Sequence, residues 1–265
     1  FGLDYNFPNI NFMVIELLGP SLEDLRKVCG GFFSLKTVCL IASSAFSLLE
    51  YIHEMNYLHR DIKPENFLTG INNLSKLIYI VDFGLSIRYR DPINHSHISY
   101  KENNNSNIGT VRFMSINNHL GIESSRKDDL ESLAYMLIYL LTGNLPWCNL
   151  LDQINNDEKC KKICEIKLHT PIEEYTKDIP YEFTILLSYS RSLLFDEKPD
   201  YNLIKEMFSK LIKKQKIKMD YVYDWCLSSN INKKVLNKNN FPFKFKFPSV
   251  SSIDDEYNQD NNNSL

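Results

Sequence analysis

The sequence lacks the cysteine patterns of a disulfide-stapled or zinc-binding protein. Only six cysteines occur among 265 residues, and no two of them are separated by just two residues. Cys160 and Cys164, the closest pair, have no histidine partner at metal-ligand spacing. We therefore expect reduced thiols rather than a disulfide framework or a structural metal site.

An excess of one charge and a long hydrophobic run are also missing. The formal net charge is -3, from 30 basic and 33 acidic residues, which argues against a nucleic-acid surface or a polybasic anchor. The longest apolar run, around Leu137 to Leu141, is shorter than the ~20 residues of a membrane span, and no signal peptide is recognisable. We expect a monomeric cytoplasmic or nuclear protein without membrane or nucleic-acid partners.

Apolar residues make up 43% of the chain, enough for one large globular domain with its own core. Residues 10–18, with their β-branched residues, predict a buried strand, and residues 76–82 predict another. Ser21 to Cys29 predicts a short helix opened by a serine cap. A polar loop is expected at 89–108 and a disordered tail at 227–265.

Two long amphipathic helices are predicted, and further helical segments should continue to about Trp225. The first begins at Ser34, and the second spans about 127–141 with Gly143 as its stop. In the first helix, one buried stripe at three- or four-residue spacing is expected from Val38, Ile41, Ala45, Leu48, Ile52 and Met55. In the second, the inward residues are expected to be Leu130, Leu133, Leu137 and Leu141.

The most informative stretch is HRDIKPEN at 59–66, followed by DFG at 82–84. Phosphoryl transfer from ATP needs a carboxylate near the accepting hydroxyl, oxygen ligands for Mg²⁺ and a cation near the transferred phosphate. Asp61 would take the hydroxyl proton and Lys63 would steady the γ-phosphate. Asn66 and Asp82 would hold the metal ion.

Both motifs match the signature of protein kinases, from which these role assignments are taken. Most kinases end the activation segment with Ala-Pro-Glu, whereas this chain has Ser115-Ile116-Asn117. That triplet, the passage at 119–147, ELLGPSLEDL at 16–25 and RSLLFDEKPDY at 191–201 resemble the casein kinase 1 family of serine/threonine kinases. The similarity runs from about Met13 to Trp225.

The resemblance implies an α+β kinase-like fold in which residues 1–18 belong to the end of the N-terminal lobe and the hinge. Residues 19–226 would form the helical C-terminal lobe, followed by the tail. For ATP, the resemblance implies a back wall and floor at Ile15 and Leu68. The implied hinge and ribose contacts are Glu16, Leu17, Leu18, Ser21 and Asp24.

Casein kinase 1 enzymes prefer acceptor sites preceded by acidic or phosphorylated residues, which requires a fixed cationic site. Arg112, in the motif GTVRFMSIN, matches the anion-binding arginine of that family. Arg60 and Lys159 are implied as its partners. Asp129 matches the buried aspartate that holds the backbone of the catalytic loop.

No glycine-rich phosphate loop, strand lysine or helix glutamate is recognisable before Met13, and Phe1 is the first residue. Since Asp61, Lys63, Asn66 and Asp82 are intact, we expect an enzyme represented by an incomplete sequence. The alternative is a truncated pseudokinase that binds protein partners without phosphoryl transfer. An unrelated helical binding module would leave the motifs unexplained.

Overall fold

A computed structural model of the chain describes residues 2–4, 7–102, 108–150 and 156–227. Its helices are α1 (Leu22–Val28), α2 (Leu35–Glu54), α3 (Ile116–His119), α4 (Arg126–Thr142), α5 (Asn156–His169), α6 (Ile172–Tyr175), α7 (Tyr181–Ser192), α8 (Tyr201–Lys214) and α9 (Asp224–Leu227). Its strands are β1 (Gly2–Asp4), β2 (Phe7–Phe12), β3 (Tyr57–Leu58), β4 (Phe67–Thr69), β5 (Ile78–Ile80) and β6 (Ile87–Arg88). The predicted tail lies outside the described residues except for its first member, Leu227.

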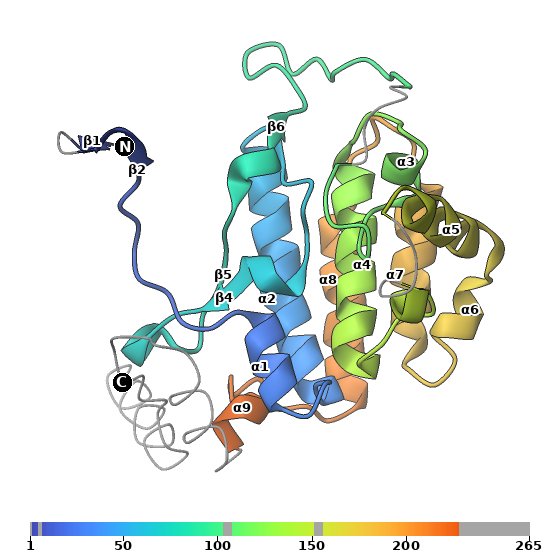
Figure 1. Ribbon diagram of the computed structural model, residues 1–265. Helices are drawn as coiled ribbons and strands as arrows, with labels where there is room; N and C mark the ends of the chain where they lie inside the picture. Colours follow the sequence, from blue (N-terminus) through green and yellow to red (C-terminus); the bar gives the residue numbers. More distant parts are fainter. Residues whose placement is uncertain (1, 5–6, 103–107, 151–155, 228–265) are drawn as a thin grey trace.

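The strands form short antiparallel pairs rather than one sheet. Within the described ranges the pairs are β1 with β2, β3 with β6, and β4 with β5. Figure 1 shows β4 and β5 lying over α2, whereas the β1–β2 hairpin stands apart from the helical body. A helical body with few strands is compatible with the kinase-like fold that the sequence predicts.

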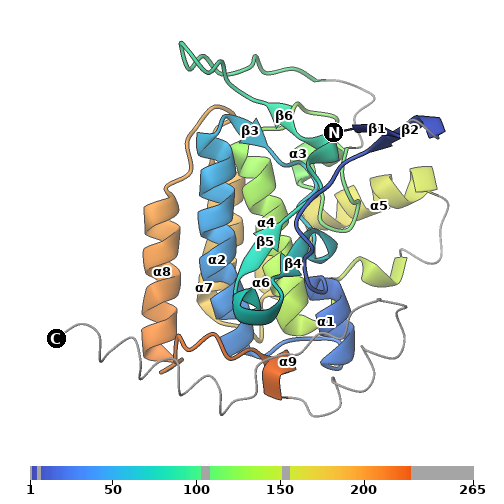
Figure 2. The ribbon, with the colours of Figure 1, turned by 90° about the vertical axis from the view of Figure 1, so that its left-hand side faces the viewer.

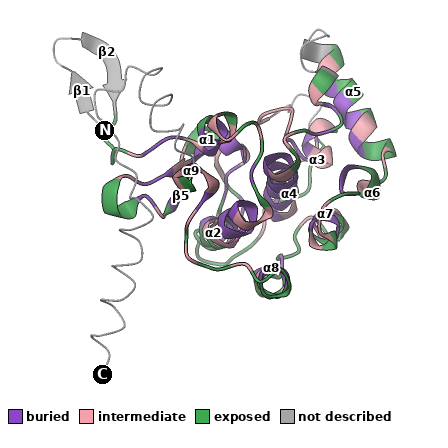
Figure 3. Ribbon diagram, turned by 90° about the horizontal axis from the view of Figure 1, so that it is seen from below, coloured by how far each residue is buried: buried purple, intermediate pink, exposed green. Residues whose placement is uncertain are grey.

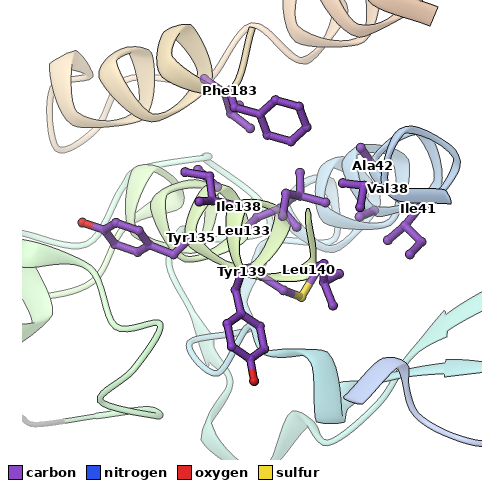
Figure 4. Packing of buried hydrophobic residues seen from close by; sticks show 14 of the residues in the cluster. Val38, Ile41, Ala42, Leu133, Tyr135, Ile138, Tyr139, Leu140 and Phe183 are labelled. Atoms are coloured by element: carbon purple, nitrogen blue, oxygen red, sulfur yellow. The ribbon is translucent and has the colours of Figure 1, made fainter. Parts of the chain in front are cut away.

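The core is built where α2 and α4 cross the middle of the molecule, as the side view in Figure 2 shows. Apolar side chains of α2, α4 and α7 meet there (Figure 4), including Val38, Ile41, Ala42, Leu133, Ile138 and Phe183, all fully or almost fully buried. Viewed from below, both central helices are largely buried whereas α8 is exposed on its outer side (Figure 3). Burying these side chains stabilises the helical body far more than helix propensity does.

Local sequence signals determine where the central helices begin and end. The hydroxyl of Ser34 accepts the backbone N–H of Thr37 at the start of α2. Gly143 ends α4 with a φ of 78°, a left-handed conformation, and a Cβ there would lie 2.8 Å from the carbonyl oxygen of Gly31. Both predicted helix boundaries are therefore confirmed to within one residue.

Helix α2 is long and apolar enough to cross a membrane by length and composition alone. In this fold it is the central core helix instead, packed between α4 and α8 and beneath β5. A core helix of a large domain has the same composition as a membrane span because both are surrounded by apolar groups.

Three sequence predictions about local structure are wrong in part. The strand expected at 10–18 ends at Phe12, and Val14 is 85% exposed, because no strand in the described part of the chain pairs with residues 13–18. The strand expected at 76–82 is shorter and spans only β5, because its partner β4 is itself short. Met55, expected in the buried stripe of α2, caps the helix and is 50% exposed.

Candidate active site

The catalytic-loop side chains converge on the carboxylate of Asp61, which is 6% exposed. The loop leaves β3, passes Asp61 and enters a 3-10 turn at Pro64–Asn66 that leads directly into β4. The ammonium of Lys63 donates to Oδ2 of Asp61 at 2.5 Å. The amide nitrogen of Asn66 donates to the backbone oxygen of Asp61 at 2.9 Å and to its Oδ2 at 3.2 Å. The three residues predicted for catalysis therefore form one cluster.

Thr110, which comes from the activation segment, completes this cluster and was not predicted to do so. Its hydroxyl and its backbone N–H donate to Oδ1 of Asp61 at 2.7 and 3.0 Å, and Lys63 donates to the same hydroxyl at 3.2 Å. Gly109 allows this approach, since its φ is 99° and a Cβ there would lie 2.6 Å from the carbonyl oxygen of Arg60. An alcohol at hydrogen-bond distance from Asp61 shows that this carboxylate can hold a hydroxyl group.

The pKa of Asp61 is lowered from its ordinary value of 3.8. Burial raises the pKa, but the hydrogen bonds from Lys63 and Thr110 favour the charged form and outweigh it. Asp61 is therefore ionised at neutral pH and available as a proton acceptor.

The backbone of the catalytic loop is held from below by Asp129 on α4, as the sequence predicts. One carboxylate oxygen of Asp129 accepts the N–H of His59 at 2.7 Å, and the other accepts the N–H of Arg60 at 2.8 Å. Nε2 of His53 lies 3.0 Å from Asp129, and burial lowers the pKa of His53, so a neutral imidazole donates this hydrogen bond. Arg60 has a φ of 66°, so this anchor also offsets backbone strain.

Asp82 and Asn66 supply hard oxygen atoms on neighbouring backbone segments. The N–H of Val81 donates to the carbonyl oxygen of Asn66 at 3.0 Å, which fixes the start of the DFG segment beside the catalytic loop. Asp82 has a φ of 66° and an exposed side chain. Its Oδ1 accepts the backbone N–H of Gly84 at a long distance of 3.4 Å. One carboxylate and one amide oxygen suit Mg²⁺, which is usually held by one or two carboxylates together with substrate phosphates.

Comparison with protein families agrees with this geometry. The family model described as "Protein kinase domain" matches residues 6–232. The chain belongs to the protein kinase family. The match covers Asp61, Lys63, Asn66 and Asp82, and it supports a phosphotransferase activity by resemblance.

Protein kinases generally use ATP and Mg²⁺, and the oxygen atoms of Asn66 and Asp82 are of the kind that suits the metal ion. When bound, the metal ion neutralises charge on the phosphates. Asn66 and Asp82 would hold it, Lys63 would approach the transferred phosphate, and Asp61 would accept the proton of the attacking hydroxyl. The buried position of Asp61 and its fixed donors orient the carboxylate before substrate arrives.

The hinge residues predicted to hold adenine lie on an exposed segment. Ile15 is 63% exposed and is not enclosed as a back wall by the described residues, while Glu16 and Leu17 are exposed and Leu18 is half-buried. The predicted floor residue, Leu68, is half-buried on β4. An isolated bridge pairs it with Ser21, so the end of the hinge is attached to the floor strand. These nucleotide contacts remain predictions.

Ser21 and Asp24, predicted at the mouth of the adenine site, cap helix α1. The hydroxyl of Ser21 donates to Oδ2 of Asp24 at 2.6 Å and accepts the backbone N–H of Asp24 at 3.2 Å. This capping box gives both side chains a structural role at the start of the helix. Contact of Ser21 and Asp24 with a ribose stays a prediction.

The three cations predicted to bind an anion come from separate elements of the kinase. Arg60 donates from Nε to the carbonyl oxygen of Leu85 at 2.6 Å, next to the DFG segment. Lys159 is half-buried on α5. The guanidinium of Arg112 lies over the ring of Tyr139 at 5.3 Å, and its Nε is buried without a hydrogen-bond partner among the described residues.

Replacing Thr110 with valine should move the acid limb of the kinase's pH profile upward. Valine keeps the shape of threonine but removes the hydroxyl donor that, together with the stronger effect of Lys63, lowers the pKa of Asp61, so Asp61 will become protonated at a higher pH. We expect kcat/KM at neutral pH to fall about 10-fold, and the acid limb to shift upward by up to about 1 pH unit. Initial rates between pH 3 and 8 measure both effects, since the wild-type limb lies below pH 3.8.

The Thr110→Ser variant is the matched control, because it keeps the hydroxyl. An acid limb at the same pH in all three proteins would show that Thr110 does not tune the proton acceptor.

Proposed function

We propose that this protein is a serine/threonine kinase of the casein kinase 1 type. It transfers the γ-phosphoryl group of ATP, with Mg²⁺, to hydroxyl groups of protein substrates. The observation that carries this proposal is the convergence of Lys63, Asn66 and Thr110 on the buried carboxylate of Asp61. This set both orients a hydroxyl and supplies a cation beside it.

The preference for acidic or phosphorylated substrates is supported by the chemistry around Arg112. Arg112 and Arg26 both lie on the ring of Tyr139, Arg26 at 4.4 Å from its centre. Arg26 is paired with Glu23, but the Nε donor of Arg112 has no partner in the described part of the chain. Arg112 as a whole is only half-buried, so the accessible part of its guanidinium can pair with a phosphate or carboxylate of a substrate.

Three peptides that differ from one another at one or two positions test the proposal in this protein. The first carries phosphoserine upstream of the acceptor serine, the second carries alanine in place of phosphoserine, and the third carries phosphoserine with a tyrosine acceptor. We expect transfer from ATP to the first peptide with kcat/KM at least about 10-fold above the second, a difference that one charge-assisted contact supplies. The third should not be phosphorylated.

Equal rates with the first two peptides would contradict the casein kinase 1 type but would leave the kinase activity standing. Transfer to the third would contradict specificity for serine and threonine. Absence of transfer to any peptide, with ATP binding or without it, would favour a pseudokinase that acts by binding its partners.

A further inference from the structure

Lys167, in the last turn of α5, is a fully buried lysine that neither the motifs nor the proposed mechanism explain. Its side chain is 0% exposed, and among the described residues no carboxylate lies within ion-pair distance of its ammonium. Burying an ammonium group without an anion is costly unless dipoles replace the lost water. The groups that surround the Nζ atom therefore indicate the role of Lys167.

The ammonium of Lys167 is surrounded by backbone carbonyl oxygens of one short segment. Its Nζ lies 2.6 Å from the oxygen of Met114, 3.3 Å from that of Val111 and 3.3 Å from that of Arg112. These residues directly follow Thr110, whose hydroxyl and N–H contact Asp61. Burial lowers the pKa of Lys167 to about 7, and this one amino group contacts three carbonyl oxygens of the segment that follows Thr110.

Side chains complete the shell around this ammonium. The rings of Tyr135 and Trp147 each lie 4.7 Å from Nζ, which is a cation–π distance, and Trp147 also donates to the oxygen of Arg112 at 2.8 Å. Nε2 of His119 lies 3.1 Å from Nζ. Burial lowers the pKa of His119 to about 3, with the charge of Lys167 contributing, so this imidazole is neutral.

The last turn of α5, which contains Lys167, is held by charged side chains of α7 and α4. Arg191 on α7 donates to the backbone oxygen of Lys167 at 3.2 Å and pairs with Glu131 on α4 at 3.3 Å. Glu131 in turn accepts the N–H of Ile116 at 3.4 Å, immediately beyond the segment that Lys167 holds. The backbone of α5 at Lys167 is thus attached to α7 and, through Arg191, to α4.

We propose that Lys167 is a positioning residue for substrate recognition: its buried ammonium holds the backbone of 111–114 and so sets Thr110 against Asp61 and Arg112 toward the acceptor peptide. The proposal rests on the kinase function proposed above, because that function gives 110–114 its role. It concerns the peptide side of the site and leaves the ATP side, built from the hinge and β4, unaffected.

Lys167→Met tests the proposal, since methionine fills most of the same space without the charge or the donors. Lys162→Met is the matched control, because Lys162 is exposed on the same helix. In Lys167→Met we expect the KM for the phosphorylated peptide to rise at least 5-fold, with the KM for ATP within twofold of wild type. Hydrogen exchange at 110–114 should accelerate at least 10-fold, while exchange in the core of α4 stays unchanged.

The outcomes separate this proposal from the proposed function. If the wild type transfers no phosphate, the kinase proposal fails, and hydrogen exchange alone decides the role of Lys167. An unchanged peptide KM in an active Lys167→Met enzyme, or exchange that rises equally in 110–114 and α4, would overturn the positioning role. Lys167→Gln, which keeps two donors, should fall between wild type and Lys167→Met. Failure of both variants to fold would show that the whole fold needs this lysine, and would also overturn the proposal.

Discussion

Asp61→Asn should abolish phosphoryl transfer while leaving the protein folded. Asparagine has the size of aspartate and still accepts one hydrogen bond, but its amide cannot take a proton from the attacking hydroxyl. It also removes the charge that pairs with Lys63. Loss of a positioned base and of its electrostatic contribution should lower kcat at least about 10³-fold. Single-turnover transfer to the phosphorylated peptide measures the effect.

Asp91→Asn is the matched control for this substitution, because Asp91 is an exposed carboxylate that accepts the backbone N–H groups of Ile93 and Asn94. Its kcat should stay within twofold of the wild-type value. The midpoint of thermal unfolding should change by only a few degrees in either variant. Transfer by Asp61→Asn at the wild-type rate would contradict the role of Asp61, whatever the fate of the fold.

Asp129→Asn should produce the largest loss of stability among single substitutions near the site. Asp129 is 2% exposed and accepts hydrogen bonds from His53 and from the backbone of His59 and Arg60. The amide of asparagine turns one acceptor into a donor that faces these N–H groups. We expect the free energy of unfolding to fall by about 3–5 kcal/mol, the usual cost of breaking a buried charged network. Urea unfolding measures it.

The pH dependence of this loss follows from the pKa of Asp129. Burial raises that pKa, but the hydrogen bonds from His53 and from the backbone N–H of His59 outweigh it, so the folded value lies below 3.8. A carboxylate with a lowered folded pKa stabilises the protein above its unfolded pKa, and this contribution is lost as the pH falls through the folded value. The difference between wild type and Asp129→Asn should therefore be full at pH 7 and shrink below about pH 4.

The neighbouring Asp128 provides the matched control. It is equally buried, but burial raises its pKa to about 7 because the hydrogen bonds from Ser115 and Ser125 do not compensate. Asparagine resembles the neutral form that Asp128 partly adopts at pH 7, so Asp128→Asn should cost less, about 1–2 kcal/mol. Equal losses for the two variants would contradict the anchoring role of Asp129.

The sequence by itself predicted the group of side chains that meet at Asp61 and located the central helices. HRDIKPEN and DFG fix residue types in an order that phosphoryl transfer requires, and both lie within a few residues of the backbone turns that hold them. The apolar spacing in α2 and α4, with Ser34 and Gly143 at their ends, is a local signal that depends on one helix at a time. Such signals can be read without knowing what packs against the helix.

Other features are decided only by the tertiary structure, because they depend on contacts between distant parts of the chain. Lys167 lies in no motif, and nothing in the motif around Thr110 shows its partner: Thr110 meets Asp61 across 49 residues, and Lys167 meets Met114 across 53. The strand predicted at 10–18 was wrong in its second half because a strand exists only where another pairs with it. Apolar side chains at 13–18 predict burial, but whether they are covered depends on a neighbour that local pattern cannot supply.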